Sequence, residues 1–264
     1  MPPVTLWVVL GHWDLEPSVI AGLVAMCLLF VWLQRQPLLR ARPGGIPCFI
    51  AGAVFLALAL LSPLDELSDR YLLTAHMIQH LLVVLVVAPL LARAMPAPWA
   101  ARLAIHPILA FVLFNAVFTF SHVPAWYEAT LVNEPLHVVE HIAYLATALL
   151  NWLPVVSPAR GKRLSYPLQM LYLFLETLPM FLVGSLLSLS DTAIYPLYLR
   201  APRIVSMSAI EDQSMAGLLM WIGGSFFYLG AMTIIFFKWA NREIGLDQPV
   251  IMEDQWLESH KLSA

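Results

Sequence analysis

The sequence predicts an all-α integral membrane protein, a bundle of seven transmembrane helices with the N-terminus outside the cell and the C-terminus in the cytoplasm. Three observations support this fold class. Apolar residues make up 60% of the chain and charged residues only 12%, whereas an average soluble domain carries about 25% charged residues. Seven apolar runs approach the length that crosses a bilayer. Basic residues gather on alternate connections between these runs, which indicates a single cytoplasmic face.

The first three apolar runs cover residues 18–34, 46–61 and 71–92. Pro17 precedes the first run and Arg35 follows it, the second run ends before a Ser-Pro pair, and the third follows a segment rich in charge. A helix rises 1.5 Å per residue, so the second run is on the short side for a hydrocarbon core of ~30 Å.

The last four runs cover residues 105–121, 135–153, 167–189 and 214–239, and the first of these is also short. Helices fit such runs better than strands, because an isolated strand in lipid would leave its backbone groups unpaired. We therefore expect one seven-helix domain over residues 1–240 and a cytoplasmic C-terminal tail over residues 241–264.

The basic residues predict the orientation. Eleven of the fourteen Lys and Arg residues fall on one side of the predicted bundle, namely Arg35, Arg40, Arg42, Arg93, Arg102, Arg160, Lys162, Arg163, Lys238, Arg242 and Lys261. Only Arg70, Arg200 and Arg203 fall on the other side. By the positive-inside rule the side with eleven is cytoplasmic. The net charge of −3 argues against nucleic acid as a partner.

Five of the eight histidines gather in the outer half of the predicted bundle. His76 and His80 are four residues apart on one helix face, about 8 and 14 Å below the outer interface. His137 and His141 share a face at the outer end of the fifth run, and His122 ends the fourth. Neutral imidazoles at this spacing can bind copper, zinc or iron. The alternative is that they hydrogen-bond between helices and bind no metal.

Other polar and sulfur-containing residues could support such a site. Glu140 lies beside His141 in sequence, and we expect it to orient an imidazole through the second ring nitrogen. Met77 and Met220 carry thioethers, which favour Cu(I), although a methionine in a helix more often fills a gap in the core. Glu176 lies near the middle of the sixth run, where it would act as a proton relay or ligand support, or would be a neutral group bonded to a neighbour.

Six stretches in this order also carry a family resemblance. They are Ala-His-Met-Ile-Gln-His-Leu-Leu (75–82), Ala-Pro-Leu-Leu (88–91), Ser-His-Val-Pro-Ala-Trp-Tyr (121–127), Leu-His-Val-Val-Glu-His-Ile-Ala-Tyr-Leu (136–145), Asn-Trp-Leu-Pro (151–154) and Asp-Gln-Ser-Met-Ala-Gly-Leu-Leu-Met-Trp (212–221). Together they resemble the CtaG-type cytochrome c oxidase assembly factors, seven-helix bacterial membrane proteins, over about residues 18–240. By this resemblance, the motif positions of the family in this chain are His76, His80, His122, His137, His141, Asp212, Gln213 and Met220. Family members often have Trp-Trp-Pro or Phe-Trp-Pro where this chain has Asn151-Trp152-Leu153-Pro154, a departure that leaves the histidines unchanged.

The resemblance implies a non-catalytic role in respiratory chain biogenesis, in which the protein matures a haem–copper oxidase in the bacterial inner membrane by supplying copper. We therefore expect an outward-facing copper site of a metallochaperone. His76 and His80 would be primary ligands, His137 and His141 the opposing pair, and His122 a gate. The implied partners are cytochrome c oxidase subunits, the lipid bilayer and periplasmic copper donors.

Three alternatives stay open at this point. One is a membrane-embedded zinc-dependent hydrolase, with three histidines on zinc and Glu140 or Asp212 as the base. Another is a haem-binding electron carrier, in which a histidine of the third run faces one of the fifth. The last is a metal-free scaffold that holds an oxidase subunit during assembly. Bound zinc with a spare water position would identify the first, and a Soret band the second.

Overall fold

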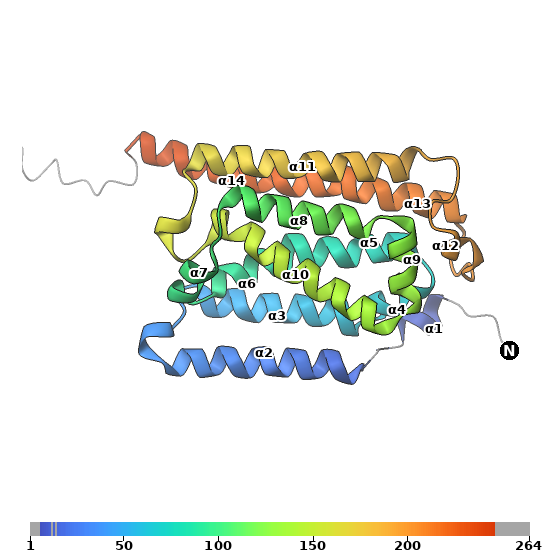
Figure 1. The fold of residues 1–264 in the computed structure, drawn as a ribbon, viewed down its shortest axis with the longest axis horizontal. Helices are drawn as coiled ribbons and strands as arrows, with labels where there is room; N and C mark the ends of the chain where they lie inside the picture. Colours follow the sequence, from blue (N-terminus) through green and yellow to red (C-terminus); the bar gives the residue numbers. More distant parts are fainter. Residues whose placement is uncertain (1–5, 12, 14, 246–264) are drawn as a thin grey trace, which may run out of the picture.

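Long helices lie side by side in the computed structural model, which describes residues 6–11, 13 and 15–245 (Figure 1). These residues form helices and no strand, so the fold is all-α as expected. His12, His260, Lys261 and most of the expected tail fall outside the described residues.

The long elements are α2 (Pro17–Arg35), α3 (Gly45–Leu61), α5 (Leu73–Leu81), η2 (Leu82–Val87), α6 (Ala88–Ala94), α8 (Pro107–Ser121), α10 (Glu134–Val156), α11 (Tyr166–Leu189), α13 (Ala209–Leu218), η4 (Leu219–Gly223) and α14 (Gly224–Glu243). Of these, α5, η2 and α6 form one continuous rod, and α13, η4 and α14 form another. Short helices lie between them: α1 (Leu6–Leu10), η1 (Pro37–Leu39), α4 (Pro63–Arg70), α7 (Ala97–Leu103), α9 (Pro124–Val132), η3 (Arg160–Lys162) and α12 (Pro196–Arg200).

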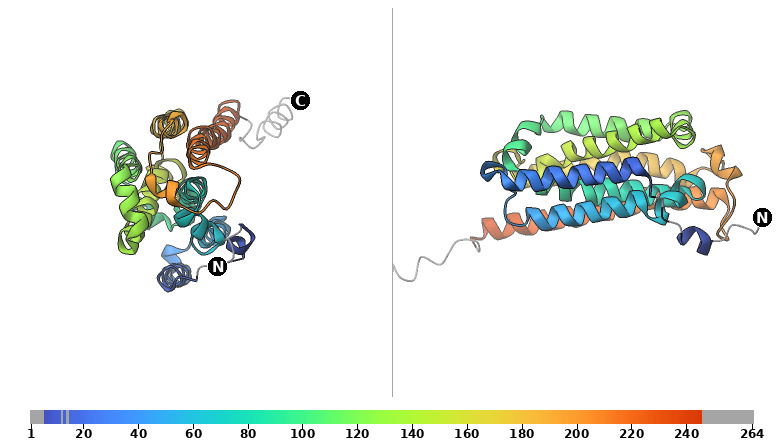
Figure 2. Two further views of the ribbon diagram at one scale, coloured as in Figure 1. Left: turned by 90° about the vertical axis from the view of Figure 1, so that its right-hand side faces the viewer. Right: turned by 90° about the horizontal axis from the view of Figure 1, so that it is seen from below.

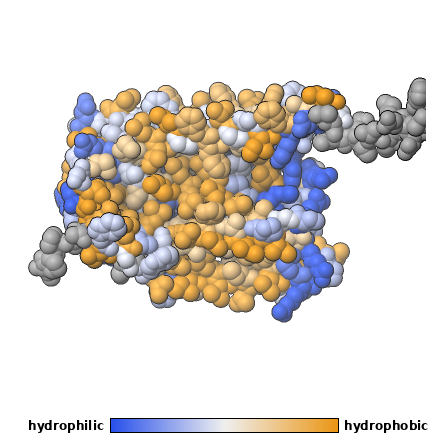
Figure 3. All heavy atoms as spheres, turned by 180° about the vertical axis from the view of Figure 1, so that it is seen from behind, coloured by the Kyte–Doolittle hydropathy of each residue, from blue (hydrophilic) through white to orange (hydrophobic). Residues whose placement is uncertain are grey.

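Five helical rods are long and apolar enough to cross a membrane: Pro17–Arg35, Leu73–Ala94, Glu134–Val156, Tyr166–Leu189 and Ala209–Glu243. Two bent pairs, α3 with α4 at 46° and α7 with α8 at 76°, bring the number to seven if each pair is one span. The described chain therefore holds five to seven candidate spans. On the face shown in Figure 3, apolar side chains form a broad band across the molecule, and hydrophilic residues gather at its ends.

The rod of α5, η2 and α6 lies at the centre of the bundle. In its most apolar stretch 67% of the residues are buried, against 11% in α2. Helices α3, α10 and α13 pack around it. Its middle segment, η2, is a π-helical stretch that begins at Leu82, directly after the turn that carries His80. A second π-helical stretch, η4, contains Met220. Wide turns of this kind often occur at functional sites, because they change the direction of the side chains next to them.

Helices α11 and α13 approach closely through small residues. A Cβ atom added to Gly217 would lie 2.4 Å from the backbone oxygen of Gly184, so only glycine fits there. The Ser188 hydroxyl donates to the Ser214 carbonyl at 2.9 Å, and the Ser214 hydroxyl donates to the Ser188 carbonyl at 3.2 Å. Small residues with reciprocal hydrogen bonds are a common way of joining helices in lipid.

Helix α2 stands at the edge of the bundle and packs mainly on α3 (Figures 1 and 2). Its sequence is apolar nearly all round, and most of its large side chains face outward, including Leu28 at 65% and Trp32 at 51% exposure. Lipid can cover such a surface, whereas water cannot do so favourably. Because α2 packs on few other helices, a cavity remains between α2 and the rest of the bundle.

Candidate functional site

Four imidazole rings from α5 and α10 form a buried, connected group. The ring centroids of His76 and His80 are 4.2 Å apart, and those of His137 and His141 are 4.5 Å apart. Between the helices, His80 lies 5.4 Å from His141 and His76 lies 6.4 Å from His137. The spacing of four residues within each helix places both rings of a pair on one face, and the packing of the two helices then brings the pairs together.

The inner pair is buried without hydrogen bonds. His76 is 0% exposed and His80 is 6% exposed, and neither ring nitrogen of either side chain has a hydrogen-bond partner among the described residues. A buried polar group left without a partner costs about 1–3 kcal/mol. A neutral imidazole has one N–H group and one lone pair, so this pair of rings offers two nitrogen atoms that can accept a hydrogen bond or bind a ligand.

Two further imidazoles have a defined tautomer. His122 Nδ1 lies 2.6 Å from the Phe118 carbonyl, and His141 Nδ1 lies 3.2 Å from the His137 carbonyl. A carbonyl oxygen only accepts, so Nδ1 carries the hydrogen in both rings, and in a neutral ring Nε2 then has a free lone pair. Both Nε2 atoms are buried and lack a hydrogen-bond partner in the described chain. Each is therefore ready to accept a hydrogen bond or to coordinate a metal.

A carboxylate that contacts an imidazole is that of Asp69, a residue that no sequence motif singled out. Its Oδ2 lies 3.5 Å from His137 Nδ1, and it comes from α4, the bent extension of α3. A carboxylate at the second nitrogen of a ligand histidine fixes the ring orientation and raises its basicity. The chain pattern offered no signal for this pairing, because Asp69 and His137 belong to different helices.

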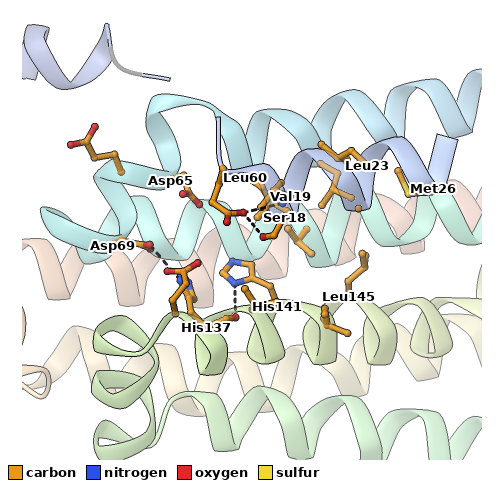
Figure 4. Close-up of a pocket in the computed structure, with 18 of the residues that line it drawn as sticks. Ser18, Val19, Leu23, Met26, Leu60, Asp65, Asp69, His137, His141 and Leu145 are labelled. Carbon is orange, nitrogen blue, oxygen red and sulfur yellow. Dashed lines mark hydrogen bonds and ion pairs between the residues drawn. The ribbon is translucent and has the colours of Figure 1, made fainter. Parts of the chain in front are cut away.

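Asp69, His137 and His141 lie in the wall of a cavity of about 530 Å³ between α2, α3, α4 and α10. The labelled polar side chains Asp65, Asp69 and His137 gather at one end, and the labelled apolar side chains Leu23 and Met26 lie toward the other (Figure 4). Glu16, Glu66 and Glu134 also line the cavity. One end is thus rich in carboxylates and imidazoles, and the other end is apolar.

The arrangement is not a preformed site for a metal ion held by His, Cys, Asp or Glu side chains. No group of three or more His, Cys, Asp or Glu side chains stands close enough to hold one among the residues that the structure describes. Rotation of the rings would be required for two or three Nε2 atoms to converge on one ion at ~2 Å. The assignment of His76, His80, His122, His137 and His141 as ligands therefore stays a prediction.

Two residues that we expected to support the site, Asp212 and Gln213, bind backbone groups of neighbouring segments. Asp212 of α13 accepts hydrogen bonds from the backbone N–H groups of Leu73 at 2.8 Å and Thr74 at 3.0 Å. It thus caps the N-terminus of α5, where the local cap residue Leu72 offers no side-chain acceptor. Gln213 accepts from the N–H of Ile194 at 2.7 Å and so ties down the segment between α11 and α12. Neither residue is in the group of imidazoles.

Two buried glutamates lie in other surroundings. The Glu140 carboxyl group is buried beside the side chains of Ser121 and Thr130. Glu176, which is 1% exposed, accepts a hydrogen bond from Asn115 Nδ2 at 3.1 Å. The predicted roles of both glutamates stay predictions.

The remaining predicted residues, Met77 and Met220, are each 1% exposed. With His80 and His122 they line a small cavity on the inner side of the imidazole group, where Met180 joins them. Met180 was not singled out from sequence, because one methionine one residue after a proline in an apolar helix carries no signal of its own.

A family model described as "Cytochrome c oxidase caa3 assembly factor (Caa3_CtaG)" matches residues 24–242. No curated protein and no solved structure matched the chain. The match spans most of the chain, including all four histidines of α5 and α10 and both predicted motif residues of α13. The chain therefore belongs to the family of caa3-type cytochrome c oxidase assembly factors.

Proposed function

We propose that this protein is a non-catalytic assembly factor of the bacterial inner membrane that binds copper at its outer end and delivers it to a haem–copper cytochrome c oxidase. The chain would cross the membrane seven times, with the N-terminus outside and the C-terminus in the cytoplasm. The family membership supplies the oxidase as the client. Copper and the direction of delivery are the parts that belong to the proposal.

One observation carries the choice of a metal-binding function. The imidazole of His80 lies in ring contact with those of His76 and His141 inside the bundle, and the Nε2 atoms of all three are buried without hydrogen-bond partners in the described chain. A purely structural cluster would gain stability from hydrogen bonds across the helices. Imidazole is a good ligand for copper in either common oxidation state. A group of imidazoles without hydrogen bonds therefore favours a ligand set over structural glue.

The charge distribution supports an outer location. Arg42, Arg93 and Arg160 act electrostatically on Arg163, so the four lie near one another. They belong to the segments before α3, at the end of α6 and around η3, which lie at the end of the bundle opposite α4 (Figure 1). Burial, followed by the neighbouring arginines, lowers the pKa of Arg163, whose guanidinium donates to the Val156 carbonyl at 3.3 Å. Because basic residues are retained on the cytoplasmic side, this end faces the cytoplasm and the cavity faces outward.

The cavity would act as the entrance. Its carboxylates attract cations from the periplasmic side, and His137 and His141 lie in its wall. A ligand set that forms by ring rotation, rather than a preformed rigid cage, would exchange the ion readily. Exchange is needed because a carrier must release copper to its client.

The test uses the double variant His76→Ala/His80→Ala. We expect the purified variant to lose bound copper, and membranes that contain it to hold oxidase with low copper content. Neither His76 nor His80 makes a side-chain hydrogen bond in the described structure, so the exchange breaks none and the variant should still fold. Added copper should partly restore oxidase activity. Metal analysis of anaerobically purified protein and of the oxidase measures both effects.

His106→Ala is the matched control, because His106 is an exposed histidine at the cytoplasmic end. It should bind copper like the unchanged protein. Normal copper content of the oxidase in the double variant, at equal protein levels, would reject copper delivery and favour the metal-free scaffold. Zinc in place of copper, with hydrolytic activity, would favour the hydrolase instead.

A further inference from the structure

A small buried cavity of about 10 Å³ lies on the inner side of the imidazole group, where α5, α8, α11 and η4 meet. Five side chains in its wall carry potential metal ligands: Met77, His80, His122, Met180 and Met220. Each of the three methionines is at most 3% exposed. The space is that of a single small ion or water molecule.

We propose that this cavity is a Cu(I) site, in which the thioethers of Met77, Met180 and Met220 and the imidazoles of His80 and His122 supply the ligands. The inference rests on the proposed function, because it assumes that copper is the cargo. It goes further in naming the oxidation state, the inner position of the ion and Met180 as a ligand.

The imidazoles are prepared for this role. His122 Nδ1 donates to the Phe118 carbonyl at the C-terminal end of α8, so Nε2 carries a free lone pair. This atom is buried without a hydrogen-bond partner in the described structure. A carbonyl at the second nitrogen is a typical outer partner of a metal-ligating histidine. His80, whose two ring nitrogens likewise lack partners, faces the same cavity from α5.

Local backbone features favour the positions of the three methionines in the cavity wall. Met220 lies in the π-helical stretch η4, where the widened turn alters the direction of its side chain. The Met180 sulfur lies 2.8 Å from the position that a Cβ atom of Gly224 would occupy, so a glycine there leaves the space that this thioether fills. Met77 is one turn before His80 on the same face of α5. Three elements distant in sequence thus each bring a methionine to the wall of one cavity.

The ligand chemistry selects the ion. Thioethers are soft ligands that favour Cu(I) over Zn(II) or Cu(II). None of the described residues that line the cavity carries a carboxylate, so a bound ion keeps its whole charge in a medium of low polarity. A monovalent ion is less costly there than a divalent one, because the cost of desolvating an ion rises steeply with its charge. The ion remains Cu(I) throughout, and no electron transfer is involved.

His80 connects this cavity to the outer group. Its ring contacts His76 at 4.2 Å and His141 at 5.4 Å between centroids, and it also lines the inner cavity. An ion held by the outer imidazoles could therefore reach the inner cavity by exchange of ligands at His80, without leaving protein ligands.

The test replaces sulfur while keeping side-chain volume, with the double variant Met180→Leu/Met220→Leu. Such exchanges usually cost less than about 1.5 kcal/mol, so the protein should fold. Under anaerobic conditions, Cu(I) affinity is measured by competition with a chromogenic chelator, and X-ray absorption reports sulfur and nitrogen neighbours. We expect a mixed sulfur and nitrogen shell in the unchanged protein. In the double variant we expect loss of the sulfur signal and at least about a tenfold weaker affinity, in line with the loss of metal-site groups elsewhere.

Met170→Leu/Met232→Leu is the matched control, because both methionines are partly buried beside the same core without lining the cavity. It should retain the affinity and the spectrum. Thermal unfolding of all three proteins checks that they are folded.

The outcomes separate this inference from the proposed function. Copper bound through nitrogen alone, unaffected by the methionine exchanges but lost in His76→Ala/His80→Ala, would overturn the Cu(I) cavity and leave copper delivery intact. Absence of copper binding in the unchanged protein, with either oxidation state, would overturn both.

Discussion

The carboxylate of Asp212 accepts a hydrogen bond of 2.8 Å from the backbone N–H of Leu73, which is 139 positions earlier in the chain. One side chain of α13 therefore closes the N-terminal end of the helix that carries His76 and His80. This contact links Asp212, near the start of α13, to α5, the helix of the His76 and His80 motif. It gives the motif residue a role in positioning α5, while the imidazoles themselves face α10.

Asp212→Ala should destabilise the protein by about 1–2 kcal/mol, because it leaves the first N–H groups of α5 without an acceptor. Asp212→Asn, which keeps one carbonyl oxygen, should lose less. Thermal unfolding in a mild detergent measures both changes. Equal stability of the alanine variant and the unchanged protein would show that the cap is replaced by water or another residue.

Asp69→Asn should weaken copper binding by about 10- to 100-fold, because the carboxylate that contacts His137 Nδ1 would lose its charge. The fold should be unaffected, since the amide retains the shape of the side chain. Asp191→Asn is the control, because Asp191 is an exposed residue of the loop between α11 and α12. Copper titration of the three proteins tests the expectation, and an affinity for Asp69→Asn equal to that of the control would contradict it.

Gly217→Ala should destabilise the bundle by about 1–3 kcal/mol, the usual effect of overpacking. Its new methyl group would lie 2.4 Å from the Gly184 oxygen and 2.6 Å from the Ser188 nitrogen, and both are backbone atoms that cannot turn aside. Gly230→Ala is the matched control in α14, since nothing lies within 4 Å of its Cβ position. The control should be neutral or slightly more stable. A similar melting temperature for both variants would contradict the close approach of α11 and α13.

Reporter fusions test the topology. Fusions after Arg42 and Arg163 should report a cytoplasmic position, and fusions after Glu66 and Pro196 an external one. The reason is the excess of basic residues at one end of the bundle. A consistent reversal would place the cavity with the carboxylates on the cytoplasmic side, and copper delivery from the periplasm would then lose its geometric support.

Much of the helix layout could be predicted from sequence. The run predicted over residues 167–189 is α11, Tyr166–Leu189, and the run predicted over residues 46–61 is α3, Gly45–Leu61. These boundaries depend on local signals, because lipid requires a continuous apolar stretch and proline favours the first turn of a helix.

The bends in the helices could not be predicted in this way. The 46° angle between α3 and α4 and the π-helical stretches η2 and η4 depend on packing partners, which the local pattern does not contain.

The sequence by itself determined the class of the protein, its family, and the placement of His76 with His80 and of His137 with His141 on single helix faces, because helical periodicity and apolar length are local properties. Only the tertiary structure decided that these two faces meet, that Asp69 contacts His137, and that Met77, Met180 and Met220 line one cavity. Such contacts join residues far apart in the chain. They follow from the way whole helices pack, and that packing is a sum of many small contacts that no short motif encodes.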